Sequence, residues 1–399
     1  EICACLVGSE MCIRDSHMDV QLDKKVSQIS VGEAQRVEII KTLMRGADII
    51  ILDEPTAVLT PQEAERLFEI LNNLKQDGKS LVFISHKLNE VMAISDRISV
   101  MRQGQYMGTV NKEETSPLDL TKRMIGREVF LNIDKAYSEA GDTILEVQDV
   151  WIPSQKETSK IRGMSLHVKA GEIVGVAGID GNGQSELVEA ITGLRKVEKG
   201  KILLCGKDIT NQSPRKVRES GLSHIPEDRN TRGLNRAMTI EENLIAVRLD
   251  QPPFTKGIMM NKSGQDTYAK EMVEQFDIRP ADYSLPTSSL SGGNAQKVVV
   301  AREVSLGNKL LVASQPTRGV DIGAIELIRN TLEKAKKAGA GVLLVSAELE
   351  EIISLSDRIV VIHEGKITGE MRADEANENN LGLLMMGGTD TGKDGEAAV

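Results

Sequence analysis

The chain has 399 residues, enough for two or three domains, and its 40% hydrophobic and 27% charged residues are typical of globular proteins. A formal net charge of −10 and only 3% aromatic residues argue against a nucleic-acid binder, which would more often present a basic face or stacking aromatics. No apolar run approaches the roughly 18–20 residues of a membrane span. We therefore expect no direct lipid insertion, and any membrane contact should run through a protein partner.

The four cysteines do not form the pattern of a disulfide framework, so we expect a reducing compartment. Cys3, Cys5 and Cys12 precede His17, and a zinc site there is an alternative, although the spacing matches no common zinc finger. The opening stretch lacks the basic start and long apolar core of a secretory signal. We expect residues 1–16 to be foreign or disordered, with a divergent helix as the alternative.

The chain repeats itself at a fixed offset of 261 positions, so that Pro55, for example, matches Pro316. The alignment runs without a gap over residues 27–126 against residues 288–387. Two copies at so long a period indicate two tandem domains rather than a solenoid. The second copy begins near residue 142, which places the start of the first copy about a hundred residues before residue 1. We therefore expect an amino-terminally truncated tandem.

Strand and helix patterns alternate in the second copy. Apolar alternation over 144–152 and 164–170 predicts half-buried strands, and residues 171–194 predict a strand, a glycine loop and a helix. Further along, the pattern predicts a strand, a helix, a strand and a final strand pair, at 310–313, 322–338, 341–346 and around Gly365. This alternation indicates an α/β domain with a mainly parallel sheet. The expected segments are a foreign start (1–16), the carboxyl-terminal part of the first domain (17–126), a linker (127–141), the second domain (142–387) and a tail (388–399).

Short motifs stand in both copies, and those that the two copies share lie 261 positions apart. The first copy contains ISVGEAQ (29–35), ADIIILDEPT (47–56) and FISHKL (83–88). The second contains GIDGNGQS (178–185), HIPEDR (224–229), LSGGNAQK (290–297) and LLVASQPTRGVD (310–321). Over residues 17–387 the chain resembles the tandem ATP-binding subunit of a bacterial ABC importer, in the group that takes up monosaccharides and nucleosides. The resemblance implies two tandem ABC-type P-loop NTPase modules, the first incomplete, with a parallel-sheet core, an antiparallel β part and a helical subdomain.

The first module carries the catalytic set that this resemblance implies. Asp53, at the end of a buried strand, would hold Mg²⁺ through a water, and Glu54 would act as general base on the attacking water. His86 would contact the γ-phosphate. A turn at Asp-Glu-Pro and a structural histidine are the alternatives, which the joint occurrence of the three residues disfavours. The signature loop of this module retains Ser30 and Gly32.

The phosphate loop of the second module, Gly178–Ser185, departs from the usual pattern because Gln184 replaces its lysine. Its backbone would still cradle phosphates in a nest around Gly181 and Gly183, with Asn182 between them. Ser185 would still bind Mg²⁺. The substitution removes the fixed positive charge that a lysine places on the β- and γ-phosphates.

The second module also lacks the catalytic set of the first. Ser314, Gln315 and Ala347 stand where the first module has its Asp, Glu and His. Loss of even one such group typically costs orders of magnitude in rate. We therefore expect the second module to bind nucleotide without hydrolysing it.

Cassette dimers of this family are head-to-tail, so each pocket combines the phosphate loop of one module with the signature loop of the other. The competent pocket would join the catalytic set of the first module with Ser291, Gly292 and Gly293, whose helix N-terminus would bind the γ-phosphate. The degenerate pocket would join the second module's phosphate loop with Ser30 and Gly32. We expect one working site in the intact protein, and a fragment that hydrolyses ATP poorly or not at all by itself.

Two further residues have family counterparts. Glu227 lies at the place of the Q-loop glutamine, which senses Mg²⁺ and touches the permease's cytoplasmic coupling helix; a solvated charge cluster is the alternative. Trp151, upstream of the phosphate loop, is a candidate for stacking on adenine, and a core or surface tryptophan is the alternative.

The resemblance implies ATP and Mg²⁺ as cofactors, two transmembrane permease subunits and an extracellular substrate-binding lipoprotein as partners, and a peripheral place on the cytoplasmic face of the cell membrane. The second-module motifs are closer to the nucleoside-uptake branch, and a ribose or galactose importer is the alternative. A soluble tandem cassette ATPase acting on ribosomes or DNA is disfavoured because no long charged arm separates the modules. A purely non-catalytic binding subunit is the remaining alternative.

Overall fold

The structure is a computed structural model that describes residues 37–38, 40–42, 47–56, 61–85, 87–102, 104–125, 141–154, 157–257 and 259–388. The chain divides into two compact units, residues 1–129 and 130–399, called unit 1 and unit 2 below. Several predictions fall outside the described residues, namely those for residues 1–16, Ser30, Gly32, His86, the linker up to residue 140 and the tail from residue 389. Among the described residues, no helix has both the length and the apolar character to cross a membrane.

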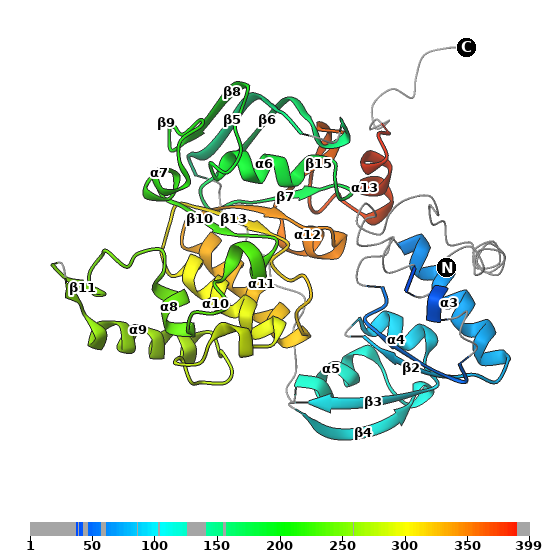
Figure 1. Cartoon of the computed structure of the whole chain (residues 1–399). Coiled ribbons are helices and arrows are strands. Elements are labelled where there is room, and N and C mark those ends of the chain that lie inside the picture. Colours follow the sequence, from blue (N-terminus) through cyan, green and yellow to red (C-terminus); the bar gives the residue numbers. More distant parts are fainter. Residues whose placement is uncertain are drawn as a thin grey trace, which may run out of the picture. The chain divides into compact units, whose positions relative to one another are not determined.

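Among the described residues, unit 1 contains two small sheets and the helices α3, α4 and α5. Strand β1 (Ile49–Asp53) pairs in parallel with β2 (Ser80–Ile84), and the connection between them contains helix α3 (Pro61–Gln76). Helix α4 (Leu88–Ile94) leads to the antiparallel pair β3 (Arg97–Arg102) and β4 (Gln105–Asn111), and helix α5 (Pro117–Ile125) follows. Figure 1 shows these elements in blue and cyan. The parallel pair with its helical crossover confirms the α/β prediction for this unit.

One face of the β1–β2 pair carries the core of unit 1, and the other face is exposed. Ile50 and Leu52 are buried against Leu67 and Leu71 of α3. On the opposite face Ile49 and Ile51 are 66% and 65% exposed, and Val82 and Ile84 of β2 are 47% exposed each. In unit 2 the equivalent strands β13 (Leu310–Ser314) and β14 (Gly341–Val345) are buried at every position. The same strand sequence pattern thus has two solvent environments in one chain.

Unit 2 is built on a six-stranded sheet in the order β10-β13-β14-β7-β15-β16. The first five strands are parallel, and only β16 (Lys366–Arg372) runs antiparallel, to β15 (Arg358–His363). Strand β7 (Ile173–Ala177) is central and buried throughout, and β10 (Leu222–Ile225) lies at one edge. The predicted strand at 310–313, helix at 322–338, strand at 341–346 and final strand pair are confirmed, with α11 spanning Ile322–Lys337.

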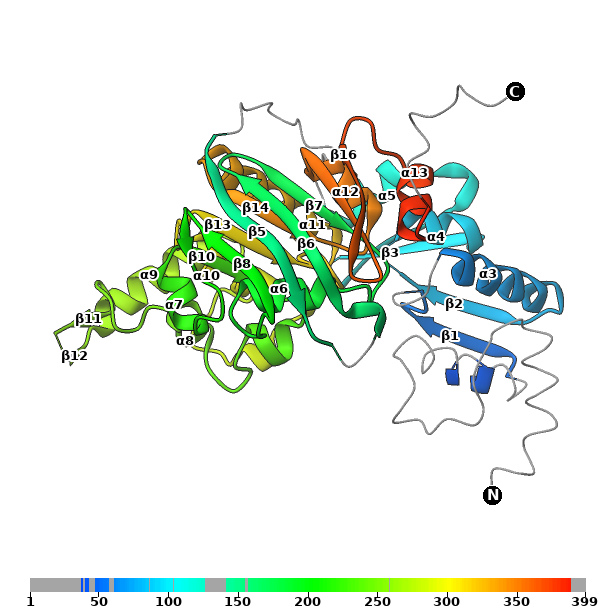
Figure 2. The ribbon, with the colours of Figure 1, turned by 90° about the horizontal axis from the view of Figure 1, so that it is seen from above.

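A second, antiparallel sheet covers helix α6 (Gln184–Ile191). Its order is β6-β5-β8-β9, formed by Ile161–Lys169, Thr143–Ile152, Lys199–Leu204 and Lys207–Asp208. Leu187, Val188 and Ile191 of α6 share one hydrophobic core with this sheet and with Val174 and Val176 of β7. Figures 1 and 2 show α6 between the antiparallel sheet and β7. The helix that begins at the phosphate loop is therefore held between two layers.

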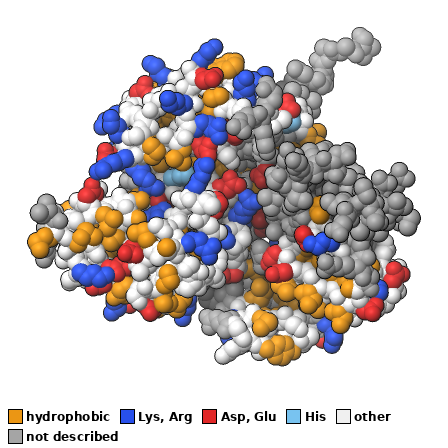
Figure 3. Space-filling view, in the orientation of Figure 1, with side chains coloured by type: hydrophobic (Ala, Val, Ile, Leu, Met, Phe, Trp, Pro, Cys, Tyr) orange, Lys and Arg blue, Asp and Glu red, His pale blue; other side chains and the backbone are white. Residues whose placement is uncertain are grey.

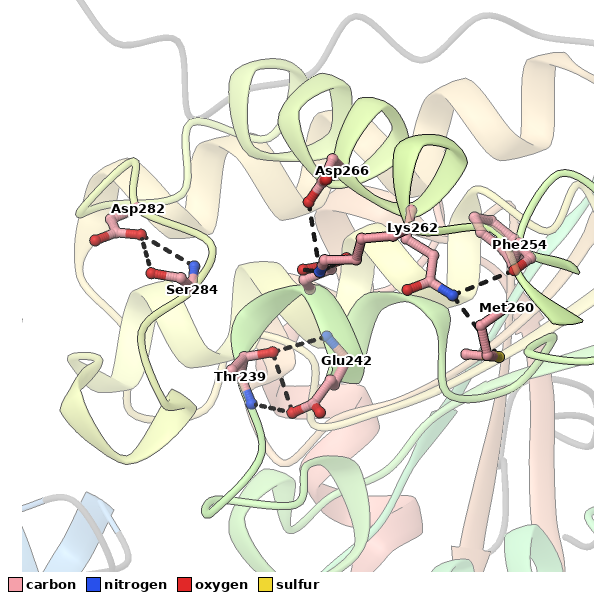
Figure 4. A network of polar contacts seen from close by, with 10 residues as sticks. Thr239, Glu242, Phe254, Met260, Lys262, Asp266, Asp282 and Ser284 are labelled. Atoms are coloured by element: carbon pink, nitrogen blue, oxygen red, sulfur yellow. Dashed lines mark hydrogen bonds and ion pairs between the residues drawn. The ribbon is translucent and has the colours of Figure 1, made fainter.

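The other face of the parallel sheet is covered by helices. Helix α10 (Gly292–Val304) packs on α8 (Ile240–Ile245), α11 and β10, and α8 packs on α9 (Lys262–Gln275). A capping box starts α8: Thr239 and Glu242 each accept from the other's backbone N–H, at 3.1 and 2.8 Å. Lys262, at the start of α9, forms an ion pair with Glu241 of α8 and another with Asp266 (Figure 4). These contacts stiffen the helical part that positions the start of α10.

The remaining elements of unit 2 are short. They are η3 (Glu157–Ser159), α7 (Pro214–Glu219), η4 (Arg229–Gly233), η5 (Thr287–Ser289), α12 (Leu349–Leu355), α13 (Glu378–Met385) and the two-stranded hairpin of β11 (Thr255–Lys256) with β12 (Met259–Met260). A parallel-sheet core, an antiparallel β part and a helical part are all present, as the sequence predicted.

Candidate functional site

The phosphate loop connects the carboxyl end of β7 to the start of α6, as predicted. Gly181 and Gly183 have φ angles of 90° and 112°. These values favour glycine, because the backbone of a residue with a Cβ would be strained there. Gly183 is also crowded, since a Cβ on it would lie 3.3 Å from Ile161. The loop thus has the strand, glycine turn and helix N-terminus of an anion-binding nest.

Gln184 does not reach out of this loop as a lysine would. Its Nε2 donates a hydrogen bond to the Ile179 carbonyl at 3.1 Å, and the side chain is buried. A Cβ on Gly178 would lie 2.3 Å from that Nε2, so glycine at 178 makes room for the amide. The amide therefore braces the loop from within and supplies no charge to a bound phosphate.

A small hollow of ≈ 20 Å³ gathers most of the second-module residues that the sequence singled out. Its lining includes Gly178, Gly181, Gln184, Ser185, Glu227, Ser314 and Gln315. These residues come from the ends of three parallel strands, where open α/β sheets bind their ligands. Asp180 and Ser346 also line it, and the sequence analysis missed both. Ser346 could have been found because it directly follows a predicted strand that neighbours β7.

Oxygen atoms suited to a hard cation meet at one side of the hollow. The Ser185 hydroxyl donates to Glu227 Oε2 at 3.2 Å, and Arg318 Nη1 donates to Glu227 Oε1 at 2.8 Å. Mg²⁺ prefers oxygen ligands, so the Ser185 hydroxyl and the Glu227 carboxylate fit such an ion. The structure thus brings Glu227 to the residue that the sequence assigned to Mg²⁺.

The end of β13 lacks the carboxylates that stand at the end of β1. Ser314 Oγ is buried and has no hydrogen-bond partner among the described residues. Gln315 Oε1 accepts from Ala347 N at 3.0 Å, so its amide bridges the loops after β13 and β14. Ser314 places a hydroxyl where unit 1 has Asp53, and Gln315 places an amide where unit 1 has Glu54. Side chains of this kind suit a site that binds a ligand without activating water.

The backbone at the general-base position is strained in both units. Glu54 has φ 46° and Gln315 has φ 48°, a left-handed conformation that is uncommon for residues with a Cβ. The N–H of each donates to the end of the next strand, Glu54 to Ile84 O at 2.9 Å and Gln315 to Val345 O at 2.7 Å. Asp53 beside Glu54 is exposed. The two units therefore share this backbone conformation and its hydrogen bond, with glutamate at the position in unit 1 and glutamine in unit 2.

The signature residues do not line the hollow of their own unit. Ser291 caps α10, and its Oγ accepts from Asn294 N at 3.4 Å. A Cβ on Gly292 would lie 2.7 Å from Arg229 Nη2, and one on Gly293 2.6 Å from Asp321 Oδ2. The two glycines thus admit close packing inside unit 2. Sequence reasoning attributed them only to the approach of a phosphate.

Three other predicted residues lie outside the lining of the hollow, namely Gly183, Asn182 and Trp151. Asn182 Oδ1 accepts from Glu364 N at 3.2 Å, so this side chain joins the loop to the β15–β16 turn. Trp151 is half-buried on β5, with Lys199 Nζ 5.3 Å from its ring centroid, a cation–π distance. Its assignment to adenine stays a prediction.

A larger open groove of ≈ 820 Å³ lies beside Glu227, between α6, α7 and β10. Four basic residues line it, namely Arg195, Lys196, Arg218 and Arg232. Figure 3 shows Lys and Arg side chains gathered over this part of unit 2. His224 also lines the groove, and burial lowers its pKa to about 4. Its Nε2 is buried with no hydrogen-bond partner among the described residues.

Comparison with known proteins gives one consistent family. The ABC transporter family model matches residues 10–57 and 161–318. The chain is 48% identical to the nucleoside import ATP-binding protein NupA of Lactococcus lactis subsp. cremoris and 45% identical to the guanosine import ATP-binding protein NupO of Bacillus subtilis. Each match covers 93% of this chain and 73% of the relative. The glucose import ATP-binding protein TsgD13 of Haloferax volcanii is 43% identical over 93% of this chain and 68% of its own length.

Among solved structures, a nucleotide-free ATP-binding cassette from an ABC transporter matches with a TM-score of 0.50 and 25% identity. The match covers 61% of this chain and 95% of that one. The cassette likeness agrees with the parallel sheet and phosphate loop of unit 2. Because the family model spans over half of the chain and the NupA match is so extensive, the chain belongs to the ABC transporter family of ATP-binding proteins.

Proposed function

We propose that this chain is the ATP-binding, energy-coupling subunit of an importer for nucleosides. The observation that carries the proposal is the hollow in which the phosphate loop, Ser185 and Glu227 converge. The import relatives, two of which are named for nucleoside and guanosine, support the transport direction and the substrate class.

The site in unit 2 binds nucleotide, and its residues are not equipped for hydrolysis. The loop's N–H groups take the phosphates, and the Ser185 hydroxyl and Glu227 carboxylate hold Mg²⁺. Mg²⁺ would neutralise phosphate charge there. Gln315 has no carboxylate to accept a proton from water, and Gln184 contributes no charge. Asp53, Glu54 and His86, with Ser291, Gly292 and Gly293, are proposed for the hydrolytic site of the working transporter.

Nucleotide binding tests this proposal directly. A fluorescent ATP analogue should bind the chain in the presence of Mg²⁺, and Ser185→Ala should weaken binding by roughly tenfold, as loss of a hydrogen bond to a charged ligand does. Ser213→Ala, an exposed serine at the start of α7 whose side chain makes no capping bond, is the matched control. Equal affinities for Ser185→Ala and the parent chain would contradict the proposed site.

Hydrolysis provides the second test. We expect slow or no ATP turnover by this chain, because its unit 2 site lacks the catalytic carboxylates. A turnover rate typical of transport ATPases, of order 1 s⁻¹ or more and abolished by Glu54→Gln, would contradict this part of the proposal.

We further propose that the partners are two transmembrane permease subunits and an extracellular substrate-binding lipoprotein, with this chain on the cytoplasmic face of the membrane. The basic groove beside Glu227 suits the permease's cytoplasmic coupling helix, because it adjoins the nucleotide hollow and is open. Co-purification with the permeases should fall when Lys196 in the groove is changed to Glu. Lys201→Glu, at an exposed residue of β8 outside the groove, should leave it unchanged.

A monosaccharide importer is the second candidate, favoured by the 43% identity to a glucose import protein. Transport assays with the assembled importer decide between the two. Uptake of a labelled nucleoside that ribose or glucose does not compete supports the first, and the reverse result supports the second.

A further inference from the structure

A buried carboxylate joins two loops at the hollow of unit 2. Glu351 on α12 is fully buried, and its Oε1 accepts a hydrogen bond from Thr317 Oγ1 at 2.8 Å. The nearby Ser346 side chain lowers the pKa of the same carboxyl group. Thr317 lies in the loop after β13, two residues beyond Gln315, and Ser346 directly follows β14. The carboxylate is therefore bonded to the first of these loops and neighbours the second, and both loops carry groups that line the hollow.

Unit 1 contains the same arrangement 261 positions earlier. Glu90 on α4 accepts from Thr56 Oγ1 at 2.6 Å and from Ser85 Oγ at 3.2 Å, in both cases through Oε2. Ser85 also accepts from Lys87 N at 3.1 Å. Thr56 is two residues beyond Glu54, and Ser85 directly precedes His86 in the sequence. We call each set of threonine, serine and glutamate a carboxylate clamp.

The clamp of unit 2 shares two of these bonds, from the threonine hydroxyl to the carboxylate and from a backbone N–H to the serine hydroxyl, while Glu351 Oε2 has no hydrogen-bond partner among the described residues. Ser346 accepts from Glu348 N at 3.1 Å, as Ser85 does from Lys87 N. The agreement is informative because the neighbouring catalytic residues differ between the units. The threonine–glutamate bond occurs both in the unit that has Glu54 and in the unit that has Gln315. Its role is therefore to set the geometry of the loop rather than to assist proton transfer.

The cation beside the carboxylate differs. In unit 1 it is Lys87, with Nζ 3.6 Å from Glu90 Oε1, next to His86 in the sequence. Position 348 of unit 2 is Glu, and the cation there is Arg329 of α11, with Nε 3.8 Å from Glu351 Oε1. Burial raises the pKa of Glu351, while Arg329, Thr317 and Ser346 lower it. The carboxylate thus has a cationic neighbour in each unit, supplied by a different element.

We propose that Glu90 and Glu351 are positioning residues, each setting the spacing between the loop after the Asp-Glu (or Ser-Gln) strand and the loop that follows the neighbouring strand. The proposal rests on the proposed function, since the clamped loops of unit 2 line the nucleotide hollow. Neither glutamate touches the reacting atoms. Each acts through the loops it fixes, which carry Gln315 and Ser346 in unit 2 and Glu54 and Ser85 in unit 1.

The experiment removes one hydroxyl without changing shape, because loss of the buried glutamate itself could unfold the protein. Thr317→Val deletes the bond to Glu351, and Thr317→Ser restores it. Thr331→Val is the matched control, since Thr331 is a buried threonine of α11 whose hydroxyl bonds only within its helix, to Leu327 O. Thr56→Val is the corresponding change in unit 1.

Two measurements decide the outcome. Thr317→Val should raise hydrogen exchange of amides in residues 314–318 and 346–348 together by roughly tenfold and weaken Mg²⁺-nucleotide binding by a similar factor. Thr317→Ser should return both to the parent values, and Thr331→Val should change neither. Thr56→Val should raise exchange in residues 54–56 and 85–87.

Unchanged exchange of the two loops in Thr317→Val, with at most a lowered melting temperature, would overturn the clamp. If the parent chain binds no nucleotide, the proposed function fails, while the exchange measurement still decides the clamp. Faster exchange of the two loops with unchanged nucleotide affinity would show a structural contact only and would also overturn the positioning role.

Discussion

At the scale of single residues, environment decides what each polar group can do. Gln184 stands where a lysine would meet phosphate, yet its amide is bonded to Ile179 inside the loop. Glu227, where an amide is usual, places a carboxylate beside the Ser185 hydroxyl. The residue types were visible in the sequence, but the direction of each side chain depends on its contacts in the fold, which for Gln184 lie in its own loop and for Glu227 lie in a distant part of the chain.

His224 gives a residue-scale prediction about pH. Its pKa falls from an ordinary 6.5 to about 4, chiefly through burial, with Glu303 opposing and Arg218, Arg232 and Arg302 adding to the effect. Between these values the unfolded chain binds the proton and the folded chain does not, so acidification favours unfolding. The loss attributable to His224 is at most about 3 kcal/mol between pH 7 and pH 4.

Chemical denaturation at several pH values checks this prediction. The His224→Gln variant should lose less stability than the parent protein as the pH falls from 7 to 4, because glutamine does not titrate. Parallel stability curves for the two proteins would contradict it. Glu303 also makes the protein less stable on acidification, because Arg302 and Arg218 lower its pKa although burial opposes them. Both proteins contain Glu303, so this contribution cancels when they are compared.

At the scale of elements, the two units contain the same ion pair, between a helix lysine and an aspartate just before a strand, but it is buried to different extents. Lys336 of α11 pairs with Asp357 at 2.6 Å, and Asp357 also accepts from Ile173 N at the start of β7. The equivalent Lys75 of α3 pairs with Asp96 at 2.6 Å. Lys336 is 1% exposed and Lys75 is 38% exposed. The repeated sequence therefore preserves the ion pair, while the packing around it sets how much it contributes to stability.

Removing the lysine should expose that difference. Lys336→Met should lower the free energy of unfolding by about 3 kcal/mol, because a partly buried Asp357 loses its counter-charge. Lys75→Met should cost less than about 1 kcal/mol, as solvent screens the pair in unit 1. Denaturant titration of both variants measures the contrast, and equal losses would contradict it.

At the scale of the whole molecule, each unit has its own hydrophobic cores, and they differ in completeness. The β1–β2 pair buries one face, whereas β13 and β14 bury both, between α6 and the antiparallel sheet on one side and helices on the other. A sheet buried on both faces needs continuous apolar strands, and both units have them. Only in unit 2 does the structure cover them fully.

A matched pair of charge substitutions tests this difference. Val312→Lys should destabilise unit 2 by about 4 kcal/mol or more, since the lysine replaces a fully buried valine. Ile51→Lys, at the equivalent position of unit 1, should be tolerated because that side chain is 65% exposed. Calorimetry of the 399-residue chain checks both, and a severe loss on Ile51→Lys would contradict the exposure seen here.

Much of the fold followed from local pattern. Apolar runs, the glycine turn at 181–183 and the 261-residue repeat predicted the order of strands and helices along the second copy, the phosphate loop and the likeness of the two halves, because these depend on neighbours in the chain. The gathering of Gly178, Ser185 and Ser314 at one hollow followed from the placing of their motifs at strand ends, whereas the place of Glu227 followed from the resemblance to the family's Q-loop, and β10 before it was not predicted.

Only the tertiary structure decided which side chains meet across long separations. The Thr317–Glu351 bond and the packing of Arg229 against Gly292 join residues from different elements. The exposure of Ile51 likewise depends on which elements pack against its strand. Such contacts depend on how layers pack, and no local spacing encodes them. The sequence by itself determined the cassette and its altered catalytic residues; the fold decided which distant carboxylates bond to the loops that carry them.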